Sequence, residues 1–290
     1  MRFPHHPAKH ARPALFTPQP FLAYRRRLGA PIARAPPQIV LGFAPNRVRR
    51  AAARLGARPI PDATDLFVSG RGPAAIGLAA TRGVGGPALA IAVEELAAIG
   101  ARRFLSVGFA GSLAAELEVG TTVLCSRALR DEGTSFHYAR PSTWAWPTRE
   151  LYLRLADRLR RLRVPFAVGS SWTVDAPYRE TIAEVRSVRA RGVRTVEMEA
   201  SAPFTVARVR GRQSAALFTV SDLLDERGWT PRPTTRSIDC SRSRSRRSGP
   251  SAPRRRRGPG ASAHAPRAPE GARFNSAAAR SRATLLRRSS

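Results

Sequence analysis

The stretch VRTVEMEASAPFTVARVRGRQSAALFTVSD (193–222) decides the fold. It opens with a short run typical of a strand, VRTVEM (193–198), and closes with an apolar run, QSAALFTVSD (213–222). Residues 199–210 between them are predicted to form a helix, which Gly211 ends. A strand, a helix and a second strand in this order build a largely parallel sheet with helices on its faces. The sequence therefore predicts an α/β fold.

The same alternation continues along the rest of the ordered part of the chain. Further strands are predicted at QIVLGFA (38–44), RFLSVGFAG (103–111), TTVLCS (121–126) and PFAVGSSWTV (165–174). Further helices are predicted at NRVRRAAARLG (46–56), PALAIAVEELAAIG (87–100), ELYLRLADRLRRLRV (150–164) and YRETIAEVRSVRARG (178–192). Ligands of such sheets bind at the C-terminal ends of the strands. Gly108–Gly111, Glu197–Glu199 and Ser221–Asp222 all fall there, so we predict one pocket at this edge.

Composition excludes several classes of protein. The 290 residues carry a net charge of +30, and Lys9 is the only lysine, so arginine supplies nearly all of the positive charge. Apolar residues make up 42% and charged residues 24%, values near the globular average. No apolar run approaches the roughly 18 residues of a membrane helix, and the N-terminus lacks the apolar core of a secretory signal. Cys125 and Cys240 cannot build a disulfide framework or a four-ligand metal site, so we expect a cytoplasmic protein.

Three regions differ in composition. Residues 1–37 are rich in proline and histidine, and we expect them to form an extended lead-in. Residues 38–231 hold the alternating strands and helices and form the predicted domain. Residues 232–290 hold 16 arginines against two acidic residues, and their few apolar side chains cannot offset the entropy of ordering the chain. We therefore expect a disordered Arg/Ser-rich tail.

The tail has two interpretations. Arginine clusters such as SRSRSRRS (241–248) and RRRR (254–257) neutralise phosphates and are typical of nucleic-acid-binding tails. A GC-rich gene read out of frame also yields arginine, alanine, proline, serine and glycine. The abrupt change of composition near Pro231 favours a frameshifted segment, which would bind nucleic acid only non-specifically, if at all.

Three local patterns are candidates for chemistry. Glu197 and Glu199 interrupt an apolar run, where carboxylates are rarely buried without partners; a sugar diol could supply the hydrogen bonds, and helix amides are the alternative. Asp222 ends a predicted strand and is a candidate general acid or an ordinary loop aspartate. RGVGGP (82–87) places backbone amides before a helix, where an anion can bind, although glycines there often form only a tight turn.

Together these stretches resemble a known family. ATRGVGGPALAIAVEELAAIGARRFLSVGFAGSL (80–113), VGTTVLCSRALRDEGTSFHYA (119–139), TVEMEASAPFTVA (195–207) and FTVSD (218–222) are similar, in this order, to the nucleoside phosphorylase family and most to its uridine phosphorylase-like branch. The resemblance runs from about residue 38 to about residue 230. It implies a three-layer α/β/α sandwich around a mixed, largely parallel sheet, and homo-oligomers built from dimers. It also implies no metal or organic cofactor, with phosphate as co-substrate.

The resemblance implies roles for residues at the sugar end of the site. Glu199 would accept hydrogen bonds from the ribose hydroxyls, with Met198 packed against the sugar and Glu197 supporting the site. His10, or one of the other histidines near the N-terminus, matches a family histidine that reaches the sugar of a neighbouring subunit. These residues are therefore expected to bind the substrate.

The resemblance places other residues at the base. Asp222 matches the acid that protonates the leaving purine in the purine-cleaving branches. Arg179 is a candidate to hydrogen-bond the base, and Tyr178 is a candidate to stack on it. Asp222 and Arg179 are therefore the expected catalytic residues, and the choice between uridine and a purine stays open.

The phosphate site departs from the family pattern. Arg47 and the amides of Gly85 and Gly86 would hold the anion. Ser106 and Phe109, however, stand where phosphorylases of this family usually carry an arginine and a serine or threonine that grip phosphate. The stretch GFAGSL is closer to the nucleosidase branch, which uses water, yet the early glutamate base of that branch is missing from the first-strand region. The nucleophile is therefore open.

These observations favour an enzyme that acts on nucleosides. The expected reaction is cleavage of the N-glycosidic bond with phosphate, giving free base and ribose 1-phosphate. A hydrolytic nucleosidase is the alternative among enzymes. An Arg/Ser-rich nucleic-acid-binding protein with an inactive enzyme-like domain is the alternative from another class.

Overall fold

The computed structural model describes residue 6, residues 8–60 and residues 65–231, all within the compact unit Met1–Asp239. A second unit, Cys240–Ser290, lies outside the described residues. The predictions for the other N-terminal histidine at position 5, for Cys240 and for the tail fall outside them as well.

The strands form one mixed sheet with a parallel centre. They are β1 Gln38–Gly42, β2 Arg58–Ile60, β3 Asp65–Ser69, β4 Ile76–Ala80, β5 Arg103–Ser112, β6 Thr122–Asp131, β7 Trp144–Ala145, β8 Ala167–Val174, β9 Val193–Glu197, β10 Gln213–Asp225 and β11 Gly228–Pro231. Neighbours follow the order β11-β10-β6-β8-β9-β5-β1-β4-β3-β2, and β7 pairs with β6. Strands β4, β1, β5 and β10 are parallel along the row, whereas β2, β3, β7 and β11 are antiparallel to their neighbours.

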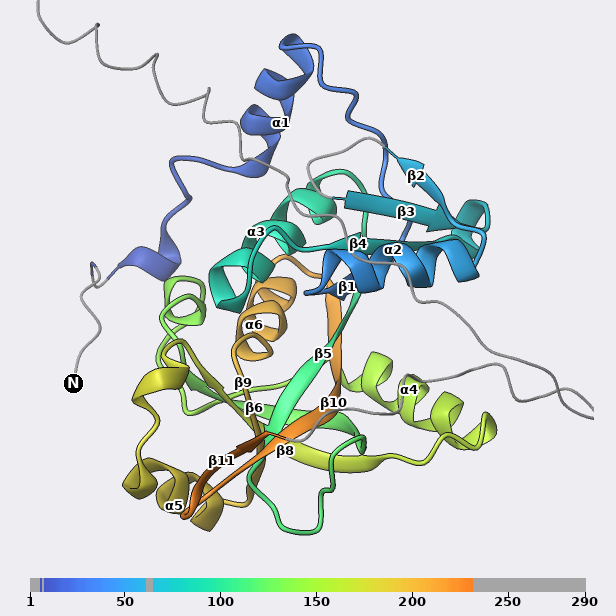
Figure 1. Cartoon of the computed structure of the whole chain (residues 1–290). Helices are drawn as coiled ribbons and strands as arrows, with labels where there is room; N and C mark the ends of the chain where they lie inside the picture. Colours follow the sequence, from blue (N-terminus) through green and yellow to red (C-terminus); the bar gives the residue numbers. More distant parts are fainter. Residues whose placement is uncertain (1–5, 7, 61–64, 232–290) are drawn as a thin grey trace, which may run out of the picture. The chain divides into compact units, whose positions relative to one another are not determined.

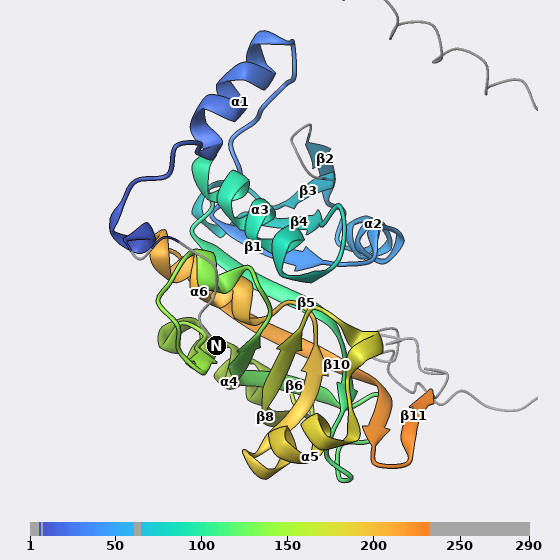
Figure 2. The same cartoon turned by 90° about the vertical axis from the view of Figure 1, so that its left-hand side faces the viewer.

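An additional pairing between β10 and β5 closes part of the sheet into a ring. The ring runs from β5 through β9, β8, β6 and β10 back to β5. Figure 2 shows β1, β3 and β4 on one side of the long strands β5 and β10, and β6 and β8 on the other. The closure has a local consequence, because Gly111 of β5 is the register partner of both Val196 in β9 and Asp222 in β10.

Helices cover both faces of the sheet. They are α1 Pro18–Arg27, α2 Pro45–Arg54, α3 Gly85–Ala98, α4 Arg149–Arg161, α5 Ile182–Ala190 and α6 Ser201–Val209, with short 3-10 turns at η1 Lys9–Ala11, η2 Gly72–Ala74, η3 Ser135–His137 and η4 Pro177–Arg179. Figure 1 shows α3 and α6 on one side of β5 and β10, and α2 and α4 on the other. The predicted α/β fold with a mixed sheet is therefore confirmed. Among the described residues, none of these helices is both long and apolar enough to cross a membrane.

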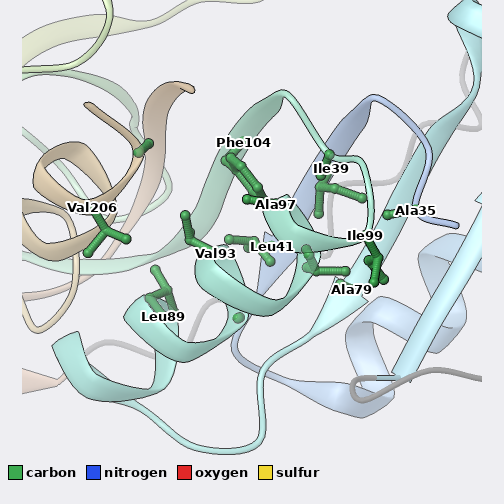
Figure 3. Close-up of a cluster of buried hydrophobic side chains, with 14 of the residues drawn as sticks. Ala35, Ile39, Leu41, Ala79, Leu89, Val93, Ala97, Ile99, Phe104 and Val206 are labelled. Carbon is green, nitrogen blue, oxygen red and sulfur yellow. The ribbon is translucent and has the colours of Figure 1, made fainter. Parts of the chain in front are cut away.

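The largest apolar cluster lies between α3, α6 and the parallel strands. Leu89, Val93 and Ala97 recur along α3 at helical spacing and face the sheet, as the sequence pattern predicts. Figure 3 shows these side chains beside Phe104 of β5, with Val206 of α6 next to them. This packing fixes the N-terminus of α3 at the C-terminal edge of the sheet, where the site was predicted.

One prediction about the N-terminal region is wrong. Residues 1–37 are not extended throughout, because Pro18–Arg27 form helix α1. Pro18 occupies the first turn, where its missing N–H is tolerated. Leu22 is the buried residue of this helix and joins the cluster against α3. A single buried side chain leaves no apolar period to detect, which explains why the sequence pattern did not reveal the helix.

Candidate active site

The junction between β9 and α6 holds the first predicted carboxylate in a fixed position. Glu197 is buried at the end of β9, and its Oε2 accepts hydrogen bonds from the amides of Glu199 (2.8 Å) and Ala200 (2.7 Å). Its Oε1 accepts a third hydrogen bond, 2.7 Å long, from the hydroxyl of Thr173 on β8. Burial, with the nearby charge of Glu199, raises the pKa of Glu197 to about 7 although these donors oppose the shift. With three donors, Glu197 supports the site rather than offering itself to a substrate.

Glu199 brings two distant segments together. The side chain is 8% exposed, and its Oε1 accepts a hydrogen bond of 2.7 Å from the amide of Gly85 at the start of α3. Burial raises the pKa of this carboxyl; backbone amides oppose that shift, and the charge of Asp175 adds to it. The predicted carboxylate and the predicted glycine loop therefore meet at one point. The same contact occupies the Gly85 amide, which was predicted to hold phosphate.

A third carboxylate, Glu132, lies in the same network and was not predicted. It follows β6 and is 2% exposed. Its Oε1 accepts from the hydroxyl of Ser201 at 2.7 Å, and its Oε2 accepts from the amide of Ser135 at 2.8 Å. A Cβ added to Gly86 would lie 3.2 Å from Glu132 Oε2 and 3.1 Å from Thr134 Oγ1. Gly86 is therefore the place where α3 packs against the loop after β6.

Asp222 lies on β10 across from β5, as the closed ring requires. Its Oδ1 accepts a hydrogen bond from the hydroxyl of the preceding Ser221. Its Oδ2 accepts a hydrogen bond of 3.0 Å from the indole N–H of Trp229 on β11. A Cβ added to Gly111 would lie 3.0 Å from Asp222 Oδ2 and 3.1 Å from Val196, so glycine permits this close approach. The segments of β5, β9 and β10 that hold Gly111, Val196 and Asp222 thus converge. Asp222 does not end its strand as predicted, because β10 continues to Asp225 and pairs with β11.

The loop after β8 brings further charged groups to this region. Asp175, Arg179 and Glu180 line a cavity of about 180 Å³ together with Trp172 and Glu184. Burial, with the charges of Asp222 and Glu184, raises the pKa of Glu180 to about 7. A larger cavity of about 530 Å³ also reaches Trp172 and Glu184 but contains none of the predicted site residues.

Tyr178, the predicted stacking residue, lies at the surface. Its side chain is 100% exposed at the tip of the η4 turn. Neighbouring Arg179 is exposed as well, but it lines the smaller cavity. The structure therefore brings Arg179 to the cavity and leaves Tyr178 outside the buried cluster.

The predicted phosphate side is lined by aromatic rings. The guanidinium of Arg47 lies 4.7 Å from the ring centre of Phe109, which is partly exposed. A Cβ added to Gly108 would lie 2.6 Å from the ring of Phe43, so that ring covers the end of β5. Ser106 is 1% exposed, and its hydroxyl has no hydrogen-bond partner within the part of the chain that the structure describes. Arg47 is thus at the expected edge, but its neighbours are apolar.

The N-terminal segment is attached to the loop after β6. His10 Nε2 donates to the carbonyl oxygen of Phe136 at 2.9 Å, and Lys9 Nζ donates to His137 Nδ1 at 2.7 Å. Both partners belong to η3, whose first residue, Ser135, donates its amide to Glu132. His10 therefore lies near the site's outer loop on its own chain.

A family model described as the phosphorylase superfamily matches residues 39–248, which is more than half of the chain. The chain belongs to the phosphorylase superfamily. The match includes each of the strand ends described above. The family expected from the sequence motifs is confirmed.

Individual members of the phosphorylase superfamily are similar over part of their length. The uridine phosphorylase of Thermococcus kodakarensis is 32% identical over 154 residues, covering 48% of this chain and 54% of that protein. The guanosine phosphorylase of Halorubrum lacusprofundi is 35% identical over 138 residues, covering 48% and 57%. The crystal structure of uridine phosphorylase from Vibrio fischeri superposes with a TM-score of 0.59 at 27% identity, covering 65% of this chain and 81% of that one. The match spans about half the length of the Thermococcus kodakarensis and Halorubrum lacusprofundi proteins.

The superfamily motifs revealed some site residues and missed others. Glu197, Glu199 and Asp222 stood out because a carboxylate at the end of an apolar strand is conspicuous. Glu132 has the same signal in RALRDEGTS (127–135), where it follows the apolar run of β6, but Asp131 beside it makes the carboxylate less conspicuous. Thr173 had no such signal, because threonine is common in strands.

Proposed function

We propose that this chain cleaves the N-glycosidic bond of a nucleoside with phosphate, releasing free base and ribose 1-phosphate. The observation that carries the proposal is the buried Glu199 carboxylate, which accepts a hydrogen bond from the Gly85 amide and follows β9 by two residues. Val196 of β9 and Asp222 of β10 both pair with Gly111 of β5. The names of the relatives, uridine phosphorylase and guanosine phosphorylase, support the same reaction. Assembly from dimers, a cytoplasmic location and the lack of a cofactor stay predictions.

The sugar end of the proposed site orients the ribose. A carboxylate offers about four acceptor positions, and the Gly85 amide holds one oxygen of Glu199 in place. The ribose hydroxyls donate to the remaining positions, with Met198 against the sugar. Glu197 cannot swing away because three donors hold it, so the turn that carries Glu199 is fixed before substrate arrives. This preorganisation lowers the entropy lost on reaching the transition state.

The base end of the proposed site stabilises the leaving group. The C1′–N bond breaks with its electron pair moving to the base, and positive charge develops on the sugar ring. Asp222 and Arg179 are the proposed groups that face the departing base, through a hydrogen bond or a proton. The carboxylates near the sugar favour the positive charge that develops there.

Phosphate and water require different residues at the end of the site where the nucleophile binds, because phosphate is an anion and water is neutral. Arg47 and the amides before α3 are the proposed phosphate ligands. Hydrolysis is the second candidate reaction, and the rings of Phe43 and Phe109 favour it, because they stand where an anion would need polar partners. The engagement of the Gly85 amide by Glu199 favours it too.

The two reactions are separated by their products. Purified full-length chain is incubated with inosine, guanosine and uridine, with and without phosphate, and the sugar product is identified. We expect free base together with ribose 1-phosphate, at a rate that rises with phosphate. Equal rates in phosphate-free buffer with ribose as product would establish hydrolysis instead. Release of base from none of the three nucleosides contradicts both reactions.

A further inference from the structure

Helix α1 carries apolar side chains that do not serve the core. Leu22 is the buried residue of this helix and packs into the cluster against α3. Tyr24 and Leu28, by contrast, are 50% and 67% exposed. With Phe21, which is partly exposed, they recur at the i, i+3 and i+7 spacing of a single helix face, and Leu22 lies on another face. Helix α1 is therefore amphipathic twice over, with one apolar face inward and one outward.

The residues before α1 extend the outward apolar face. The ring of Phe16 lies edge-on to that of Phe21, with 6.1 Å between the ring centres and an angle of 72° between the planes. Phe16 and Leu15 are both exposed. We call Leu15, Phe16, Phe21, Tyr24 and Leu28 together the α1 patch. Isolated exposed apolar side chains are ordinary, whereas a group of them on one short segment marks an interaction surface.

The α1 patch is not explained by membership of the superfamily or by the proposed site. The family model matches residues 39–248, and α1 ends before that range begins. Figures 1 and 2 both show α1 at the edge of the fold, beyond α3. None of the carboxylates at the strand ends lies on this helix.

The charge around the α1 patch has a single sign. Residues 1–37 contain seven basic residues and no aspartate or glutamate. Arg25, Arg26 and Arg27 occupy the last turn of α1. Burial raises the pKa of Glu95 on α3, and the charge of Arg25 opposes that shift, so Arg25 has an acidic neighbour. For Arg26 and Arg27, no ion pair is found within the described part of the chain. Positive charge that the fold does not neutralise therefore accompanies the patch.

The combination of charge and apolar surface selects among three kinds of partner. A second copy of α1 would bring the arginines of both copies together, and like charges repel. A nucleic acid would match the arginines and the aromatic rings, but Leu15 and Leu28 have no flat face on which a base can stack. A bilayer with anionic headgroups matches both properties. Basic residues beside Phe and Leu side chains are typical of helices that lie in the plane of a membrane surface.

We propose that α1 binds the surface of a membrane that contains anionic lipids, with the α1 patch as the contact. Phe21, Tyr24 and Leu28 enter the boundary between headgroups and acyl chains. Arg26 and Arg27 bind the lipid phosphates through their flexible side chains. Binding of this type is reversible and becomes weaker at high salt. This inference does not rest on the proposed function.

Vesicle binding by the full-length chain tests the proposal. We expect co-sedimentation with vesicles of equal parts phosphatidylcholine and phosphatidylglycerol, and none with phosphatidylcholine alone. In Tyr24→Ser/Leu28→Ser the partition coefficient should fall at least about tenfold, because burial of one large apolar side chain already accounts for such a factor. Leu55→Ser/Leu162→Ser is the matched control, since these leucines are exposed to a similar extent outside α1 and should not affect binding. Both variants keep every arginine, so attraction through residues 232–290 is the same in each.

A fluorescence measurement tests insertion with a nearly unchanged chain. Tyr24→Trp puts an indole on the α1 patch, and aromatic side chains of this kind favour the membrane interface. Its emission, taken as the difference from the wild-type spectrum, should shift to shorter wavelength with the anionic vesicles, because water leaves the indole's surroundings. Leu55→Trp should show no shift. A Tyr24→Trp spectrum that the vesicles leave unchanged would overturn the proposal even if the serine variants failed to fold.

The remaining outcomes assign the patch to another partner or to none. Equal vesicle binding by Tyr24→Ser/Leu28→Ser and the wild-type chain, or equal binding to neutral and anionic vesicles, would overturn the proposal. Loss of affinity for a single-stranded RNA in that variant, with vesicle binding intact, would assign the patch to nucleic acid. A lower mass by light scattering, again with vesicle binding intact, would assign it to contact between copies of the chain. Absence of vesicle binding by the wild-type chain would remove the inference and leave the proposed function untouched.

Discussion

Glu197 and Glu199 are two residues apart, but Glu197 has a structural role and Glu199 is the proposed ligand-binding residue. Glu197 accepts three hydrogen bonds from its own chain, two of them from the amides of Glu199 and Ala200 just before α6. Glu199 accepts one such bond from Gly85 and keeps acceptor positions for a ligand. Replacing Glu197 should therefore lower the stability of the fold, whereas replacing Glu199 should weaken substrate binding at the proposed site. The alternation arises because the strand ends between them and the chain turns into the helix.

Glu199→Gln tests the sugar-binding role. We expect kcat/KM for the preferred nucleoside to fall by a factor that corresponds to roughly 2–4 kcal/mol of transition-state stabilisation, by analogy with the loss of an oxyanion-hole donor. The unfolding midpoint should stay close to that of the wild-type chain, because glutamine keeps an acceptor for the Gly85 amide. Glu118→Gln, an exposed glutamate in the loop after β5, is the control. A rate near wild type in Glu199→Gln would place the ribose elsewhere.

At the scale of elements, the sequence predicted most of the parallel core and little of its edges. The strands around Ile39, Phe104 and Val220 are apolar and end in glycine or polar residues, so their position and length were visible. Five strands were not predicted. β2, β7 and β11 have two to four residues each, too few to show a period. β3 and β4 have five residues each, and β4 belongs to the parallel row beside β1. The pairing of β10 with β5, which closes the ring, joins residues about 110 apart and has no local signal.

The same distinction applies to the candidate site. Carboxylates at strand ends were found because they contrast with the apolar runs before them. Glu180 was missed because it lies in a polar loop, where one more charged residue is ordinary. Its distinctive property is the absence of a donor within the described residues together with the nearby charge of Asp222, and both depend on the folded arrangement. The aromatic cover over β5 was missed for the same reason, since Phe43 and Gly108 are far apart in sequence.

Gly108→Ala and Phe43→Ala form a double-mutant cycle that tests how β1 and β5 meet. A Cβ at position 108 would lie 2.6 Å from the Phe43 ring, so Gly108→Ala alone should destabilise the fold by about 1–3 kcal/mol through overpacking. With Phe43→Ala in the background, that loss should shrink by about 1 kcal/mol or more. Urea denaturation gives the free energy of unfolding of each variant. Phe67→Ala on β3 is the control background and should leave the effect of Gly108→Ala unchanged. Strict additivity with Phe43→Ala would contradict the contact.

At the scale of the whole molecule, buried carboxyls set how stability depends on pH. The pKa of Glu197 is raised to about 7 mainly by burial, and the pKa of Glu180 is raised to about 7 by burial and by Asp222. The pKa of a glutamate in the unfolded chain is about 4.3. Between about pH 4.3 and about pH 7 the native state therefore binds more protons than the unfolded state. The stabilisation from these groups is complete below the unfolded value and is lost as the pH rises through about 7.

Exposed carboxyls and net charge act in the opposite direction at low pH. Hydrogen bonds lower the pKa of Glu116, Glu184 and Glu226, so their contribution is present above the ordinary value and is lost in acid. Protonation of carboxylates also increases the positive charge of a chain that already carries +30, which strengthens self-repulsion.

We therefore expect the thermal midpoint to be highest between about pH 5 and pH 6 and to fall by about 2–8 °C between pH 6 and pH 8. Differential scanning calorimetry measures the thermal midpoint of the wild-type chain, Glu197→Gln and Glu118→Gln across this pH range. Glu197→Gln should flatten the decline because it has no proton to lose, whereas Glu118→Gln should leave it unchanged. A midpoint that rises from pH 6 to pH 8 would mean that these carboxyls are ionised in the native state at pH 6.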